Sequence, residues 1–89
     1  MTKQFFIYGR VQGVGFRYFS WKEAEKLGIK GSVRNRVDGS VEVIAQGNES
    51  QLRGFEQWLR EGPKTAKVEK IIVNDHRDII ADHFSIIHR

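Results

Sequence analysis

The sequence contains no cysteine and a single proline. The absence of cysteine excludes disulfide bonds, thiolate metal sites and cysteine nucleophiles. Long apolar runs are also missing. Near the N-terminus only Phe5-Phe6-Ile7-Tyr8 precedes the charged Arg10, which is too short for the core of a signal peptide or for a membrane span. We therefore expect a cytoplasmic protein with no membrane partner.

The size and charge of the chain set the next limits. Its 89 residues, 39% of them hydrophobic, predict one folded domain over residues 1–89. The net charge of +4 favours anionic partners, either nucleic acid or a small phosphorylated substrate. Because the basic residues are scattered along the chain and form no run, we expect most of them on a solvated surface.

The most informative stretch is Gly9-Arg10-Val11-Gln12-Gly13-Val14-Gly15-Phe16-Arg17. Residues 4–8 before it are rich in aromatic and β-branched types, as in a buried strand. Residues 16–27 predict an amphipathic helix whose buried face carries Phe16, Ser20, Ala24 and Leu27. A glycine-rich turn into a helix N-terminus directs backbone N–H groups at one point, where the helix dipole attracts anions. The stretch therefore predicts an anion cradle, to which Arg17 adds a planar fork of donors.

A hairpin is predicted in the middle of the chain. Residues 32–37 alternate, with Val33, Asn35 and Val37 on one face. Asp38-Gly39 follows and predicts a type I′ turn, because both residues tolerate a positive φ. A third strand then carries Val41, Val43 and Ala45 on one face and ends at Gly47.

The rest of the chain predicts one more helix and two strands. Asn48 is a good N-cap, and Gln51 completes a capping box. Leu52, Phe55 and Leu59 should face the sheet, with Trp58 packing beside them, until Gly62-Pro63 ends the helix. A fourth strand is predicted over residues 67–73 and a polar loop over residues 74–82. Residues 83–88 alternate again, as in a short edge strand.

This order of elements predicts an α+β fold. The economical arrangement is a ferredoxin-like split βαβ sandwich, with an antiparallel sheet of four strands plus a short C-terminal strand and both helices on one face. The loop after the first strand then lies near the second strand. Asn35 can therefore point toward the cradle that ends in Arg17.

Residues 7–17 (Ile-Tyr-Gly-Arg-Val-Gln-Gly-Val-Gly-Phe-Arg) resemble the first signature of the acylphosphatase family. Residues 31–47 resemble its second signature, with Gly31, Asn35, Gly39, Val41 and Gly47 at matching intervals. The resemblance covers essentially the whole chain. Two positions depart from it: Ser32 stands where an aromatic residue is usual, and Arg36 where a small or neutral residue is common. We expect Ser32 to alter outer-face packing and Arg36 to tune substrate preference.

The resemblance implies hydrolysis of an acyl phosphate to a carboxylate and phosphate, with Arg17 and Asn35 as the catalytic residues. The phosphate would be held mainly by the backbone of Gln12, Gly13, Val14, Gly15, Phe16 and Arg17, and Asn35 would hold a water in line with phosphorus. The implied partner is a small acyl phosphate. Inorganic phosphate would act as a product inhibitor, and the protein would be a monomer.

No metal or other cofactor is expected. His76, Asp78, Asp82 and His83 form a polar cluster, but they lack the spacing of a zinc motif and are predicted to be solvated loop residues.

Two other functions fit the same predicted fold. A basic split βαβ sandwich is also the architecture of RNA-recognition domains, but these stack bases on aromatic residues of the third strand. Here Val41-Glu42-Val43-Ile44-Ala45-Gln46 has no aromatic residue, so we expect no nucleic-acid partner. The second alternative is an anion-sensing or acyl-carrier accessory module, since acylphosphatase-like domains also occur within larger maturation proteins. We do not expect it, because this chain has no room for the additional domains.

Overall fold

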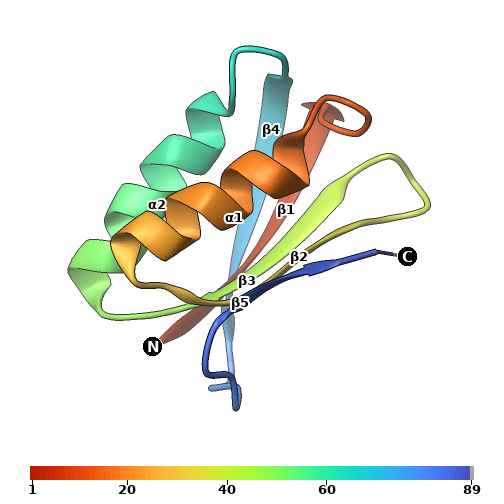
Figure 1. The fold of residues 1–89 in the computed structure, drawn as a ribbon. Coiled ribbons are helices and arrows are strands. Elements are labelled where there is room, and N and C mark those ends of the chain that lie inside the picture. Colours follow the sequence, from red (N-terminus) through yellow and green to blue (C-terminus); the bar gives the residue numbers. More distant parts are fainter. Residues whose placement is uncertain (89) are drawn as a thin grey trace.

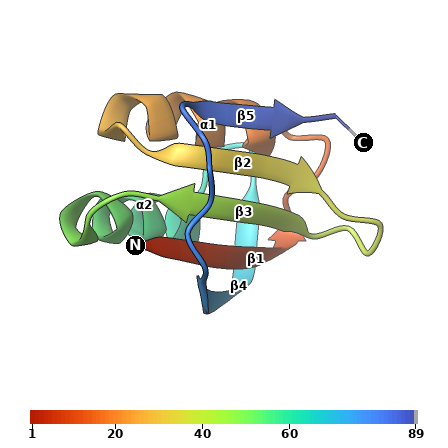
Figure 2. The ribbon, with the colours of Figure 1, turned by 90° about the horizontal axis from the view of Figure 1, so that it is seen from below.

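The computed structural model describes residues 1–88. Along this part of the chain the elements are β1 (Thr2–Arg10), α1 (Phe16–Leu27), β2 (Lys30–Asn35), β3 (Val41–Gln46), α2 (Glu49–Glu61), β4 (Lys67–His76) and β5 (Phe84–Ile87). Both helices cover one face of a single sheet (Figure 1), and Figure 2 shows the opposite face, which no helix covers. The predicted α+β ferredoxin-like sandwich is confirmed. None of the helices in residues 1–88 is long and apolar enough to cross a bilayer.

The sheet has five strands in the order β4-β1-β3-β2-β5. β1 pairs antiparallel with β3 and β4, and β2 pairs antiparallel with β3, as predicted. β5 instead pairs parallel with β2, from Gly31 opposite Phe84 to Arg34 opposite Ile87, so the sheet is mixed. The C-terminal strand lies at an edge, as expected, but its direction could not be read from alternation, which is the same in both directions.

The connection from β4 to β5 explains this direction. It crosses the uncovered face of the sheet near the start of β1 (Figure 2). Thr2 Oγ1 donates to Asp78 Oδ1 at 2.8 Å, and the backbone N–H of Ile79 donates to Gln46 Oε1 at 2.8 Å. These bonds return the chain to the end of the sheet where β2 begins, so β5 runs beside β2 in the same direction. β4 extends to His76, beyond the predicted 67–73, because its backbone continues to pair with β1 as far as Thr2.

The core lies between the sheet and the two helices. Phe5 and Ile7 of β1 and the inward residues of β3 are fully buried, as the alternation predicts. The helices contribute the residues expected from their spacing: Phe16, Ser20 and Ala24 from α1, and Leu52, Phe55 and Leu59 from α2. Trp58 stacks on Phe55 with ring centroids 6.4 Å apart, which confirms its packing role.

The start of α2 also follows the prediction. Asn48 Oδ1 accepts from the Gln51 N–H at 2.8 Å, and Gln51 Oε1 accepts from the Asn48 N–H at 2.8 Å, so the capping box is formed. Gln51 Nε2 also donates to the carbonyl of Leu27 at 2.9 Å. The same side chain therefore caps one helix and ties it to the end of the other.

The hairpin between β2 and β3 differs from the prediction. β2 ends at Asn35, and Val37 is fully exposed instead of continuing the inner face. The prediction of a type I′ turn is wrong. Such a turn needs a positive φ at Asp38 as well as at Gly39, and within residues 1–88 no residue other than glycine has a positive φ. Within this loop only Gly39 has a positive φ, of 92°, and the Arg36 N–H donates to the Ser40 carbonyl at 2.8 Å. A longer loop with one left-handed glycine closes the hairpin.

Hydrogen bonds from Ser40 explain the conformation of Asp38 in this loop. The Ser40 hydroxyl and backbone N–H both donate to Asp38 Oδ1, at 2.6 and 3.0 Å. They lower the pKa of the Asp38 carboxyl below its ordinary value, the hydroxyl having the larger effect. The Asp38 side chain thereby accepts the hydrogen bonds that hold the turn, while the Asp38 backbone stays outside the left-handed region.

We predict that Ser20→Ala stabilises the protein. Ser20 is fully buried in α1, and among residues 1–88 its Oγ has no hydrogen-bond partner. Removing the hydroxyl and gaining the higher helix propensity of alanine should raise the free energy of unfolding by about 1 kcal/mol in urea titrations. Ser50→Ala, at an exposed position in the first turn of α2, controls for propensity. Equal stability changes in the two variants would show that the Ser20 hydroxyl is satisfied in solution.

Candidate active site

The turn between β1 and α1 leaves the N-terminus of the helix open. Gly13 has φ 74°, and Gly15, the N-cap residue, is left-handed with φ 80° and ψ 15°. In residues 1–88 no side chain caps this helix end, so its first N–H groups can bind a ligand. Val11 and Phe16, both buried, fix the two ends of the turn against the core.

Two hydrogen-bonding side chains join this turn to segments elsewhere in the sequence. Gln12 Nε2 donates to the carbonyls of Arg36 and Ser40, at 2.7 and 2.9 Å, and so joins the turn to the β2–β3 hairpin. Thr65 Oγ1, from the connection between α2 and β4, donates to the carbonyl of Val14 at 2.6 Å. From the sequence Gln12 was expected to act mainly through its backbone, and Thr65 was not identified. No local pattern marks either contact, because both depend on segments that meet only in the folded chain.

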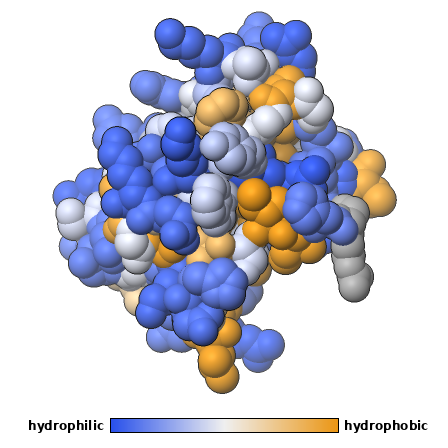
Figure 3. Space-filling model, in the orientation of Figure 1, coloured by the Kyte–Doolittle hydropathy of each residue, from blue (hydrophilic) through white to orange (hydrophobic). Residues whose placement is uncertain are grey.

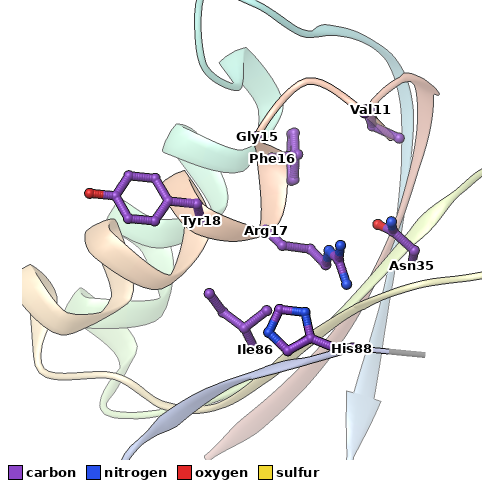
Figure 4. Close-up of a pocket in the computed structure, with 9 residues that line it drawn as sticks. Val11, Gly15, Phe16, Arg17, Tyr18, Asn35, Ile86 and His88 are labelled. Carbon is purple, nitrogen blue, oxygen red and sulfur yellow. The ribbon is translucent and has the colours of Figure 1, made fainter.

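A cavity of about 300 Å³ opens beside the turn. Figure 4 shows its walls, which come from the turn, from the first residues of α1, from the end of β2 and from β5. The lining residues are Val11, Gly13, Gly15, Phe16, Arg17, Tyr18, Asn35, Ile86 and His88. The cavity therefore contains both predicted catalytic residues and both cradle glycines.

Arg17 is positioned by the C-terminal strand. The side chain is half-buried in the first turn of α1, and Nη1 donates to the carbonyl of Ile87 at 3.0 Å. One part of the guanidinium is thus held by backbone, while the side chain lines the cavity. This contact was not predicted, because it depends on the parallel pairing of β5 with β2.

Asn35 reaches the same cavity from the sheet. It is the last residue of β2, opposite Val41 of β3, and it lies on the same face of the strand as the buried Val33. Figure 4 shows its side-chain amide directed toward the Arg17 guanidinium. This arrangement was predicted from the order of the elements. β5 pairs with β2 along its outer side, so Asn35 does not lie on an edge strand.

Positive charge is not offset by a carboxylate at the cavity. None of its lining residues within the described part of the chain is Asp or Glu. Glu42, the one buried carboxylate in residues 1–88, accepts from Arg34 and Gln4 on the uncovered face of the sheet. An anion in the cavity would therefore meet N–H donors and a guanidinium without competition from a carboxylate.

Arg36 does not point into the cavity beside Arg17. Its guanidinium lies 4.5 Å from the centre of the Phe6 ring, and Nη1 donates to Ser40 Oγ at 3.1 Å. Asp38 is 3.5 Å from the same atom. Arg36 lines a separate cavity with Gln12 and Asn35, so any effect on substrates would be exerted from the hairpin side.

The polar cluster near the C-terminal end lies away from this site. His83 bonds to Asp82 at 2.7 Å and to Ser85 at 3.1 Å, and His76 belongs to β4, not to a loop. Across residues 1–88 no group of three or more His, Asp or Glu side chains is placed to hold a metal ion.

Comparison with known proteins identifies the family. The sequence pattern of the family described as Acylphosphatase matches residues 3–86. A protein of Pasteurella multocida (strain Pm70) named Acylphosphatase is 56% identical over 78 residues, which cover 88% of this chain and 87% of that protein.

Two solved structures show the same fold. Acylphosphatase from Bacillus subtilis superposes with a TM-score of 0.93 at 41% identity and covers 98% of both chains. An acylphosphatase from Coxiella burnetii gives a TM-score of 0.92 at 31% identity, covering 97% of this chain and 90% of that one.

The fold and these comparisons thus define a small α+β hydrolase whose cavity lies beside an uncapped helix N-terminus. The chain belongs to the acylphosphatase family. Its reaction is the hydrolysis of acyl phosphates to a carboxylate and phosphate.

The role of the left-handed turn before α1 in phosphate binding can be tested, with the left-handed turn after α1 as a matched control. Gly15 and Gly28 flank the same helix, both are left-handed, and an added Cβ would lie 3.3 Å from Phe19 or 3.2 Å from Gln51. We expect both Gly15→Ala and Gly28→Ala to destabilise the protein by about 1–2 kcal/mol. Only Gly15→Ala should also weaken phosphate binding, because it reorients N–H groups of the cradle. The two quantities are the free energy of unfolding and the inhibition constant of phosphate. Equal phosphate affinity in the two variants would exclude the turn as the anion site.

Proposed function

We propose that Arg17 and the backbone of residues 12–17 bind the phosphoryl group, and that Asn35 orients the attacking water. The observation that carries this proposal is the meeting of Arg17, Asn35 and the glycine turn in one cavity. These groups come from α1, β2 and the β1–α1 turn. If each served only packing, nothing would bring all three to the same cavity. The cavity of about 300 Å³ suits a small acyl phosphate.

The binding half of the proposal follows from the donors. The N–H groups of Gln12, Gly13, Val14, Gly15, Phe16 and Arg17 surround the open helix N-terminus, and the guanidinium matches two phosphoryl oxygens. The bond from Arg17 Nη1 to the Ile87 carbonyl restricts the side chain before substrate arrives. Fixed donors of this kind stabilise the charge that develops on the phosphoryl oxygens in the transition state.

The attack by water requires a neutral group that can hold the water molecule in position. The amide of Asn35 has one acceptor and two donors, so it can accept a hydrogen bond from the water and aim its oxygen at phosphorus. A bond then forms from the water oxygen to phosphorus, the bond from phosphorus to the acyl oxygen breaks, and the carboxylate leaves. A phosphoryl oxygen accepts the proton. The good leaving group explains why no general base is needed beside Asn35.

The proposal includes no metal or other cofactor, and it places the protein in the cytoplasm as a monomer that binds neither nucleic acid nor membrane. Figure 3 shows hydrophobic residues in separate patches on one side of the molecule, without the continuous apolar face that a stable dimer buries. β3 carries no aromatic residue on the uncovered face of the sheet, where an RNA-recognition domain stacks bases.

The two catalytic residues should be separable by mutation. Arg17→Gln should weaken phosphate binding and slow turnover, because the guanidinium contacts the phosphoryl group in both ground and transition states. Asn35→Ala should lower kcat by ~10²–10³, or roughly 3–4 kcal/mol, with nearly unchanged phosphate affinity, because it removes only the group that aims the water. The measurements are kcat for benzoyl phosphate and the phosphate Kd by calorimetry.

Folding must be controlled in both variants, since Asn35 ends a central strand and Arg17 bonds to β5. Thermal unfolding midpoints close to that of the unmutated protein establish this. Loss of phosphate binding in Asn35→Ala, with its rate on bound substrate retained, would mean that the two roles are reversed.

Inorganic phosphate should inhibit competitively with the acyl phosphate. As a product it can occupy the same N–H groups and Arg17, whereas the leaving carboxylate has fewer fixed partners. Phosphate should therefore raise KM and leave kcat unchanged in steady-state assays. A purely noncompetitive pattern would place the anion site outside this cavity.

A further inference from the structure

The parallel pairing of β5 with β2 brings His88 to the end of the strand that carries Asn35. Val33 is opposite Ile86, and Arg34 is opposite Ile87. Continuing this register by one residue sets Asn35 opposite His88. Residues two positions apart share a face of a strand, so His88 follows Ile86 as Asn35 follows Val33. Adjacent strands are about 4.8 Å apart, which places His88 next to the proposed water-orienting residue.

The bond between Arg17 and Ile87 fixes the backbone next to His88. Arg17 Nη1 donates to the Ile87 carbonyl at 3.0 Å, so the backbone that leads into His88 is held near the guanidinium. His88 lines the same cavity as Arg17 and Asn35. In Figure 4 the guanidinium lies between the Asn35 amide and the His88 ring. The ring is therefore part of the cavity wall that faces the glycine turn across Arg17.

The other two histidines have different surroundings. His83 is engaged by Asp82 and Ser85, and Nδ1 of His76 lies 2.7 Å from the carbonyl of Arg77. Neither lines the cavity of Arg17. His88 is thus the histidine of this chain that is placed to meet a substrate, and an exposed imidazole has an N–H that can donate to an anion.

We propose that His88 is a further substrate-binding residue, whose imidazole N–H donates to a non-bridging oxygen of the phosphoryl group. This inference rests on the proposed binding of phosphate by Arg17 and the cradle. The glycine turn and Arg17 hold the phosphoryl group from one side, and His88 closes the side formed by β5. In its protonated form the ring also adds a positive charge, which strengthens the bond to an anion.

Because of this charge, the contact is expected to make anion binding depend on pH. Histidine changes its charge between about pH 5 and about pH 8. Among the described residues that line the cavity, the other titratable groups are Arg17 and Tyr18, both from α1, and β2 contributes the neutral Asn35. Neither arginine nor tyrosine changes its charge in that range. Binding of an anion that does not itself titrate there should therefore strengthen as the pH falls, through His88.

Sulfate is the appropriate probe, because it keeps its charge over this range while phosphate does not. The measurement is the inhibition constant of sulfate against benzoyl phosphate at several values from about pH 5.5 to about pH 8, the range of imidazole titration. We expect His88→Ala to raise the constant by about three- to tenfold at the acidic end, the size of one hydrogen bond, and to remove most of the pH dependence. His88→Gln should keep a donor but lose the pH dependence.

His76→Gln and His83→Gln are the matched controls and should keep the pH dependence of the unmutated protein. If His88→Ala leaves both the sulfate constant and its pH dependence unchanged, the His88 proposal is wrong. Arg17→Gln separates this result from a failure of the proposed function. Weakened sulfate binding in Arg17→Gln together with unchanged binding in His88→Ala overturns only the role of His88, whereas unchanged binding in both overturns the cradle itself.

Discussion

The structure depends on how the chain turns from β1 into α1. The turn must bring the helix back across the sheet, and it must leave the first N–H groups of the helix without internal partners. Gly15 meets both requirements, because its left-handed conformation reverses the chain without a capping side chain. The burial of Val11 and Phe16 fixes the ends of the turn, so the helix N-terminus is held rigidly at the edge of the core.

Other segments complete the site around this turn. The side chain of Gln12 binds the hairpin that follows Asn35, and Thr65 binds the turn from the side of α2. Arg17 reaches across to the backbone of β5. The proposed anion site is therefore held from three directions by hydrogen bonds, each of which joins residues far apart in the sequence. Fixed donors need little reorganisation when charge develops during the reaction.

The charge distribution follows from the same packing. Carboxylates on the sheet are engaged on its uncovered face, as Glu42 is by Arg34. The inner end of β2 instead presents the neutral Asn35 to the cavity. The two faces of one strand thus separate an ion-paired surface from a site that favours anions. Arg36, one residue along, belongs to the first of these faces and packs on Phe6.

Local sequence determined most of the elements of this protein. The helical spacing of Phe16, Ser20 and Ala24, the alternation of Val41, Val43 and Ala45, and the capping box of Asn48 and Gln51 depend on neighbours within one or two turns or strands. Such patterns are governed by local geometry, and each element formed near the residues that its pattern indicated, although β2 spans Lys30–Asn35 instead of 32–37 and β4 continues to His76. The glycine turn could be predicted for the same reason, and the family resemblance assigned Arg17 and Asn35 to one site with it.

Tertiary structure alone decided the direction of β5, the shape of the hairpin loop and the supports of the site. Alternation is identical in both directions along a strand, so only the path of the chain across the uncovered face made β5 parallel to β2. The hairpin loop was set by the bonds of Ser40 to Asp38, which no propensity for Asp-Gly anticipates. Gln12, Thr65 and the carbonyl of Ile87 act through partners more than twenty residues away, and such contacts exist only once the layers have packed.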